Sequence, residues 1–150
     1  MCKQTEEAKR AEEAKVTREE GSNELSDSRP LILVADDEAV LRESIRYLLK
    51  DYFRIVEASN GLEALEAYEK HRPDVVLMDI MMPFMNGIEA TREILKRDPD
   101  AIILAISAYS DKKGKEILEA GAKAILPKPF RRRELVEFIM KHINDGHATP

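Results

Sequence analysis

The sequence has almost no cysteine and very little histidine. Cys2 is the single thiol among 150 residues, so the chain cannot form an internal disulfide. The absence of disulfides is typical of a reducing compartment, and we expect a cytoplasmic protein. Three histidines and one cysteine are also too few for a conventional structural zinc site. The stability of the chain therefore has to come from a hydrophobic core.

Long apolar runs and an excess of basic residues are missing as well. No stretch approaches the roughly 18 consecutive apolar residues of a membrane-spanning helix. The first ten residues, MCKQTEEAKR, are charged throughout and lack the apolar stretch of a secretory signal. The formal net charge is −5 without a basic stripe, which argues against a dedicated nucleic-acid binder. The hydrophobic share of 43% nevertheless suffices for the core of one domain.

The first 30 residues differ in composition from the rest of the chain. They hold six Lys or Arg and eight Asp or Glu, and Leu25 is their only leucine. Such a segment cannot bury enough surface to fold as a separate domain. Residues Thr5–Glu20 favour a solvated helix, with a docking or dimerising arm as the alternative. The expected parts are a charged N-terminal tail (1–30), a folded domain (31–144) and a C-terminal tail (145–150).

From residue 31 onward, short apolar runs alternate with amphipathic stretches. Leu41, Ile45, Leu48 and Leu49 share one face of a helix. The apolar runs are continuous rather than alternating, as in parallel strands that are buried on both faces. The pattern predicts an α/β fold, a doubly wound parallel sheet built from five strand–helix units. The expected strands are Leu31–Ala35, Phe53–Val56, Val75–Met78, Ala101–Ile106 and Ala124–Leu126, and the expected helices are Ala39–Lys50, Leu62–His71, Gly87–Arg97, Lys112–Ala120 and Arg132–Ile143.

Polar side chains that can bind ions or take part in reactions follow four of the five expected strands. Right-handed crossovers place the carboxyl ends of all parallel strands at one edge of the sheet, where ligands bind in such folds. We therefore expect these side chains to gather at that edge. They are Asp36 and Asp37 after the first strand, Asp79 after the third, Ser107 after the fourth, and Lys128, between two prolines, after the fifth.

The chemistry of this set points to a phosphoryl group. Three carboxylates this close repel one another unless a cation intervenes. An all-oxygen acidic pocket suits a hard octahedral ion, and Mg²⁺ fits best. A lysine and a hydroxyl beside such an ion can neutralise and hydrogen-bond phosphoryl oxygens. A carboxylate can also attack phosphorus and form an acyl phosphate.

Each of these residues has an ordinary structural explanation when it is taken alone. Asp36 and Asp37 can cap a helix and favour its first turn through the helix dipole. Ser107 can be a simple turn residue. Lys128 is less ordinary, because the prolines on both sides restrict its backbone. The placement of all of them at strand ends favours the chemical interpretation.

Four segments carry a resemblance to a known family. They are LILVADDEAVLRESI, VVLMDIMMPFMNGIEA, ILAISAY and GAKAILPKPF, and the most specific stretch is Asp79–Gly87, D-x-x-M-P-x-x-N-G. Over about Leu31–Asn144, the sequence resembles the receiver domain of bacterial two-component response regulators. The resemblance implies a flavodoxin-like (βα)5 fold with strand order 2-1-3-4-5.

The resemblance assigns roles around the carboxylates. Asp79 matches the aspartate that accepts a phosphoryl group from a histidine kinase. Asp37 and Asp79 match direct Mg²⁺ ligands, and the main-chain carbonyl of Met81 matches a third. Asp36 is expected to act mainly through a metal-bound water.

It also assigns roles on the last two strands. Ser107 matches the family's switch hydroxyl and Lys128 its phosphate-binding lysine, with a cis Lys128–Pro129 bond. One position departs from the family, because Ile125 stands where a Tyr or Phe is usual. A β-branched side chain cannot turn inward as a ring does, so we expect weaker activation or a readout through the backbone alone.

Two bulky residues match positions that in the family tune water access to the phosphate. They are Met81 and Tyr109. We expect them to shield the phosphoryl group and to make its hydrolysis slower than in a Met81→Asn/Tyr109→Glu variant.

The resemblance implies a single-domain signalling switch that catalyses only its own phosphorylation and dephosphorylation. Asp79 would accept a phosphoryl group from a histidine kinase or a phosphotransfer protein in a Mg²⁺-dependent reaction. Residues 145–150 are too few for an output domain, so the expected output is contact with a downstream protein or onward phosphotransfer. We expect neither nucleic-acid nor membrane partners, and homodimerisation on phosphorylation stays open.

Two other functions remain as alternatives. A phosphorylation-independent interaction module could use the same fold, and Ile125 argues slightly for it. A Mg²⁺-dependent phosphatase is less favoured, because the sequence has no D-x-D-x-T motif. It also has no glycine-rich nucleotide motif of the G-x-x-x-x-G-K-[ST] or G-x-G-x-x-G type.

Overall fold

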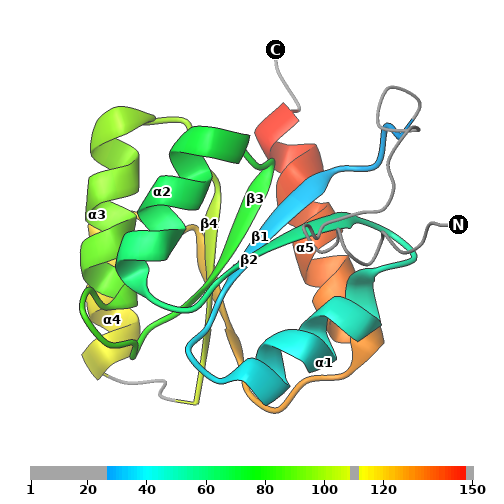
Figure 1. Ribbon diagram of the computed structural model, residues 1–150, viewed down its shortest axis with the longest axis horizontal. Coiled ribbons are helices and arrows are strands. Elements are labelled where there is room, and N and C mark those ends of the chain that lie inside the picture. The colour runs from blue at the N-terminus through cyan, green and yellow to red at the C-terminus, as the bar shows by residue number, and fades with distance from the viewer. Residues whose placement is uncertain (1–26, 109–111, 148–150) are drawn as a thin grey trace, which may run out of the picture.

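The computed structural model describes residues 27–108 and 112–147, with side chains up to residue 144. The expectations for the tail over residues 1–26, for Tyr109 and for residues 148–150 fall outside this part of the chain. Five strands and five helices alternate within it (Figure 1). Their bounds are β1 (Leu31–Ala35), α1 (Ala39–Leu49), β2 (Arg54–Ala58), α2 (Gly61–His71), β3 (Val75–Asp79), α3 (Gly87–Arg97), β4 (Ile103–Ser107), α4 (Lys112–Ala120), β5 (Ala124–Pro127) and α5 (Arg132–His147).

The sheet has the predicted topology. All strand pairs are parallel and the order is β2-β1-β3-β4-β5, which confirms the flavodoxin-like doubly wound fold. The order reverses direction between β1 and β3, so the loops after these two strands diverge and leave room between them. The carboxyl ends of β1, β3, β4 and β5 lie at the edge that was expected to hold the functional side chains.

Helices cover both faces of the sheet. In Figure 1, α2, α3 and α4 lie on one side of the strands, whereas α1 and α5 lie on the other. Two separate clusters of buried side chains correspond to these faces. Neighbouring strand residues divide between them, with Leu33 and Val76 in the first cluster and Ile32 and Val75 in the second. Burial on both faces explains why the strands read as continuous apolar runs.

Helix caps set the start of α2 and α3, the helices that precede and follow β3 in the chain. Asn60 accepts a hydrogen bond from the Glu63 amide at the start of α2. Asn86 and Glu89 form a complete capping box at the start of α3, with each side chain bonded to the other's backbone amide. Each cap satisfies amides that the first turn leaves without helical partners.

The strand and helix ends differ from the sequence prediction by a few residues. β2 begins at Arg54 and continues to Ala58, because all five of its residues pair with β1. β4 runs over Ile103–Ser107 rather than from Ala101, and α5 continues to His147 rather than ending at Ile143. Apolar periodicity ends where the buried face ends, whereas the backbone hydrogen bonds of a helix continue into solvent.

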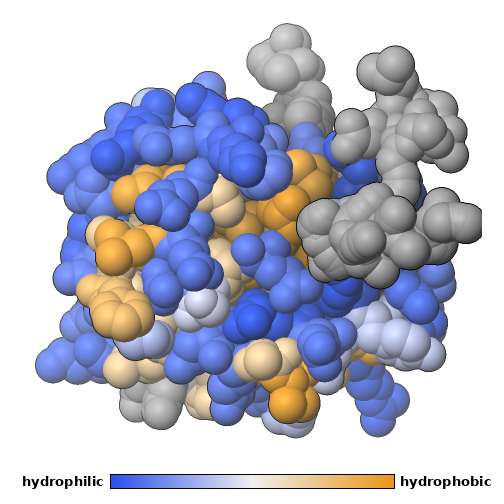
Figure 2. Space-filling model, in the orientation of Figure 1, coloured by the Kyte–Doolittle hydropathy of each residue, from blue (hydrophilic) through white to orange (hydrophobic). Residues whose placement is uncertain are grey.

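The outer surface is mostly hydrophilic. In the view of Figure 2, hydrophobic side chains gather in patches at the left, on the α2–α3 side, and also near the middle and at the lower edge. Among the residues that the structure describes, no helix has the length and apolar character needed to cross a membrane.

Candidate functional site at the carboxyl edge of the sheet

Three carboxylates meet at the point where the strand order reverses. Asp36 and Asp37 follow β1, and Asp79 is the last residue of β3. One carboxylate oxygen from each lies within 4.8 Å of the other two. Asp36 and Asp79 are buried and Asp37 is exposed, so the pocket opens to solvent on the Asp37 side. The prediction that these three residues gather at one edge is confirmed.

Hydrogen bonds hold both the backbone and the carboxylate of Asp36. Its amide donates to the Ala58 carbonyl of β2 at 3.1 Å. Its side-chain Oδ1 accepts from the Glu38 amide at 2.9 Å. Its carbonyl oxygen accepts from the Arg42 guanidinium at 2.7 Å. A fully buried carboxylate needs such partners because it has lost its water.

Lys128 brings a positive charge to the two buried carboxylates. Its Nζ lies 3.4 Å from Asp36 Oδ2 and 3.5 Å from Asp79 Oδ1. The Lys128 amide donates to the Ser107 carbonyl at 2.9 Å, which ties the loop after β5 to the end of β4. The Lys128–Pro129 peptide bond is cis, as the family resemblance implied.

Asp79 is buried where its charge is disfavoured. The pKa of its carboxyl is raised from 3.8 to about 6, chiefly by burial and next by the negative charge of Asp36. Lys128 opposes the shift through its positive charge and a hydrogen bond, and Asp37 adds a smaller upward effect. One ammonium does not balance three carboxylates, so the pocket attracts a further cation.

The loop after β3 leads from Asp79 into α3 by a close backbone approach. A Cβ atom at Gly87 would lie 2.1 Å from the Asp79 carbonyl oxygen, so no larger residue fits there. The Gly87 amide donates to the Ile80 carbonyl at 2.8 Å. Together with the Asn86 cap, this contact explains the N-G ending of the D-x-x-M-P-x-x-N-G motif. In the same loop Phe84 is 84% exposed and has a positive φ of 68°.

The remaining predicted residues within the described part of the chain lie in β4, in the loop after β3 and in β5. Ser107 is buried at the end of β4, one residue beyond the partner of Asp79 in the β3–β4 register. Met81 follows Asp79 by two residues and is 47% exposed. Ile125 of β5 is partly buried and packs against the core cluster on the α4 side of the sheet.

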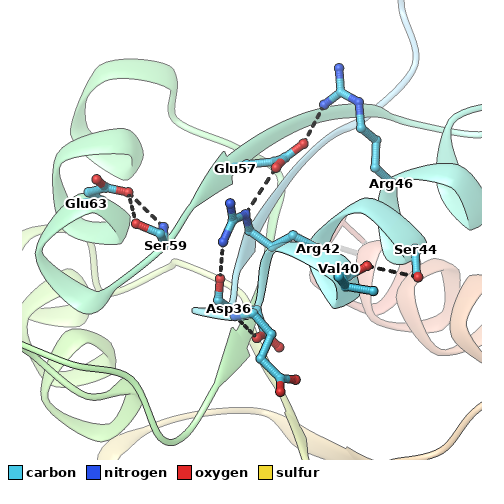
Figure 3. Close-up of polar contacts among 9 residues, drawn as sticks. Asp36, Val40, Arg42, Ser44, Arg46, Glu57, Ser59 and Glu63 are labelled. Carbon is cyan, nitrogen blue, oxygen red and sulfur yellow. Dashed lines mark hydrogen bonds and ion pairs between the residues drawn. The ribbon is translucent and has the colours of Figure 1, made fainter.

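Two residues of this region were missed by the sequence analysis. Arg42 of α1 bonds the Asp36 carbonyl, and Glu57 of β2 forms an ion pair with Arg42 (Figure 3). The signal available in the sequence was a glutamate inside the otherwise apolar run Ile55–Ala58. A charged residue in a strand calls for a partner, but periodicity does not say which residue supplies it.

The family comparison agrees with this geometry. The family model described as the response regulator receiver domain matches residues 32–140. The chain belongs to the response regulator receiver family. Receiver domains act in two-component signalling, and phosphorylation and Mg²⁺ binding at an acidic pocket are typical of them.

Individual receiver proteins are similar to this chain in sequence and in fold. The chain is 41% identical over 110 residues to chemotaxis protein CheY of Halobacterium salinarum, which covers 72% of this chain and 92% of that protein. Its fold matches CheY in the CheX–CheY–BeF3–Mg²⁺ complex of Borrelia burgdorferi with a TM-score of 0.70, 30% identity and coverage of 74% and 87%. It also matches the receiver domain of a Pseudomonas aeruginosa sensor histidine kinase, solved with magnesium in its active site cleft, with a TM-score of 0.74, 30% identity and coverage of 78% and 99%.

The donor set of the pocket fits Mg²⁺. The ion takes six oxygen ligands at roughly 2.0–2.1 Å, so ligand oxygens lie about 3–4 Å apart. The three carboxylate oxygens, all within 4.8 Å of one another, are close to that spacing. The open side at Asp37 leaves space for the waters that Mg²⁺ usually keeps.

Proposed function

We propose that this receiver domain is a phosphorylation switch in which Asp79 accepts a phosphoryl group in a Mg²⁺-dependent reaction. The observation that carries the proposal is the position of Lys128. Its ammonium lies within 3.5 Å of Asp79 at a pocket that holds two further carboxylates. The ammonium offsets part of the cost of burying the Asp79 carboxylate, and it also lies where a developing phosphoryl charge requires a cation.

Each side chain has a separate task in this proposal. An Asp79 oxygen attacks phosphorus, so that a P–O bond forms as the bond to the donor breaks. Lys128 neutralises one phosphoryl oxygen, and the Ser107 hydroxyl donates a hydrogen bond to another. When bound, Mg²⁺ would supply charge neutralisation at the same oxygens. Asp37, Asp79 and the Met81 carbonyl would hold the ion directly, and Asp36 would hold it through water.

The proposed donor is a histidine kinase or a phosphotransfer protein in the cytoplasm. The proposed output is contact with a downstream protein or onward phosphotransfer, and the domain acts on no external substrate. The Borrelia structure, in which CheY is bound to CheX, supports a protein as the target. A phosphoryl group on Asp79 carries up to about two negative charges in place of the single charge of the carboxylate, and this change biases a two-state equilibrium of the surrounding loops.

A phosphorylation-independent interaction module is the second candidate. Ile125 favours it, because this partly buried aliphatic side chain replaces the aromatic ring that usually reports the switch. Such a module would bind its partner equally well with and without a phosphoryl group.

Intact-mass measurement with a small acyl-phosphate donor separates the two candidates. We expect an adduct of about 80 Da on the wild-type chain, present only with Mg²⁺ and absent from Asp79→Ala. The adduct should be labile to hydroxylamine, as acyl phosphates are. If the cognate kinase is also unable to label the wild type, while partner binding is intact, the switch is excluded and the module is favoured.

A further inference from the structure

Arg42 joins the acidic pocket to the α1–β2 surface. It lies in the first turn of α1, and its side chain is only 18% exposed. Its Nη1 donates to the Asp36 carbonyl at 2.7 Å, and its Nε donates to Glu57 Oε1 at 3.1 Å. Two nitrogens of one planar guanidinium are therefore used, Nη1 toward the pocket and Nε away from it.

Glu57 aligns this fork from the neighbouring strand. Its two oxygens bind two arginines of α1, with Oε1 on Arg42 and Oε2 on Arg46 at 2.9 Å (Figure 3). Arg46 does not contact Asp36, and its side chain is 46% exposed. The two ion pairs share one carboxylate, but only the Arg42 pair continues to the pocket.

The Asp36 carbonyl is the point through which Arg42 can act on the metal ligands. This oxygen belongs to the same planar peptide unit as the Asp37 amide, so fixing one fixes the other. The Asp37 side chain is exposed and forms no hydrogen bond or ion pair within the described residues. Its direction therefore depends on its backbone, which the Arg42 contact holds together with the hydrogen bonds from the Asp36 amide to Ala58 and from the Glu38 amide to Asp36.

We propose that Arg42 is a positioning residue for Mg²⁺, which holds the Asp36–Asp37 peptide so that both carboxylates face the ion, with Glu57 aligning its guanidinium. The inference rests on the proposed function only in taking the pocket as a Mg²⁺ site.

A purely electrostatic role and a positioning role of Arg42 predict opposite changes in the Mg²⁺ Kd when Arg42 is removed. A cation close to the pocket repels Mg²⁺, so by charge alone Arg42→Ala would bind the ion more tightly. If Arg42 positions the ligands, the same variant binds it more weakly. Mutation of a residue that orients a metal ligand through a hydrogen bond typically lowers the metal affinity by about 10–100-fold. The direction of the change in Kd therefore decides between the two.

The experiment is calorimetric titration of the full chain with MgCl₂. We expect Arg42→Ala to raise the Mg²⁺ Kd by about tenfold or more. Arg42→Lys keeps the charge but cannot make both bonds, so it should weaken binding in the same direction. Glu57→Gln should cause a smaller loss. The matched control is Arg46→Ala, which removes the same charge and the other ion pair of Glu57, and should stay within about twofold.

Thermal unfolding in EDTA shows whether each variant is folded. If Arg42→Ala is not folded, the Kd of Arg42→Lys is compared with that of the wild type instead. An unchanged or tighter Kd in the folded Arg42 variants overturns the proposal, as does an equal loss in Arg46→Ala. A wild type that binds no Mg²⁺ overturns it too. A wild type that binds Mg²⁺ but never forms the Asp79 adduct refutes the proposed function alone, because the Kd comparison still stands.

Discussion

The middle of the central strands and their carboxyl ends are built from opposite kinds of residue. Ile32, Leu33 and Val34 of β1 are completely buried and apolar. Two residues further along the same chain, Asp36 is equally buried but carries a carboxylate. β3 repeats the pattern, with Leu77 in its middle and Asp79 at its end. The fold thus buries aliphatic side chains, which is favourable, next to carboxylates, whose burial is costly.

The difference teaches where stability and chemistry come from. Burial of an aliphatic side chain stabilises the fold by about 1.5–3 kcal/mol, whereas a buried carboxylate needs partners to be tolerated at all. Lys128 partners Asp36 and Asp79 but does not balance the whole acidic set. The unbalanced charge makes the edge receptive to a cation, and the apolar strands supply the stability that tolerates it.

The largest expected effect tests the apolar side of this comparison. Leu77→Ala removes a fully buried side chain from the middle of β3 and should lower the free energy of unfolding by about 3–4 kcal/mol. The stabilisation caused by added Mg²⁺ should be unchanged, because the ligand residues are untouched. Urea denaturation with and without Mg²⁺ measures both quantities, and a loss below about 1 kcal/mol would contradict the prediction.

The next effect tests the charged side. The pKa of Asp79 is raised from 3.8 to about 6, so the folded state holds this proton more tightly than the unfolded chain. The contribution of this group to stability is therefore highest below pH 4 and declines as the pH rises to about 6. At pH 7 without Mg²⁺ we expect the ionised carboxylate to lower the free energy of unfolding by at most about 3 kcal/mol, the equivalent of this difference in pKa.

Asp79→Asn should restore most of that stability at pH 7 in EDTA and should flatten the decline between pH 4 and 6. Denaturation curves of both proteins at pH 4, 5, 6 and 7 measure the difference. A wild type that gains stability from Asp79 as the pH rises through this window would refute the assignment.

A smaller effect concerns a polar atom outside the functional edge. Thr91 of α3 is fully buried, and among the described residues its hydroxyl oxygen is a buried side-chain atom without a hydrogen-bond partner. Thr91→Val keeps the β-branched shape and removes the hydroxyl, so it should raise the free energy of unfolding by about 1 kcal/mol. Thr91→Ser keeps the hydroxyl and is the control, which should not be more stable than the wild type.

The smallest effect concerns backbone strain beside the pocket. Phe84 has a φ of 68°, a left-handed conformation that asparagine tolerates better than an aromatic residue. Because the ring is also exposed, Phe84→Asn should raise the free energy of unfolding by about 0.5–1 kcal/mol. Phe84→Ala, which removes the ring but not the penalty of a Cβ in this conformation, should gain less.

Much of the fold could be predicted because buried parallel strands have a simple and recognisable sequence pattern. Continuous apolar runs such as Val75–Met78, followed by amphipathic stretches, indicate strands buried on both faces. The strand ends of β2 and β4 were less accurate, because pairing with neighbouring strands extends or shortens a strand beyond its apolar core. The motif Asp79–Gly87 located the β3–α3 loop. Its glycine is required because a Cβ at Gly87 would collide with the Asp79 carbonyl oxygen.

The sequence by itself determined the strand–helix order, the residue types at each strand end and the likeness to receiver domains. The tertiary structure decided which of those residues meet. The distances from Lys128 to Asp36 and Asp79, the raised pKa of Asp79 and the Arg42–Asp36 contact all join residues from different elements. Burial and charge act through space, so a periodic pattern along one chain predicts its elements but not the electrostatics at the edge where they converge.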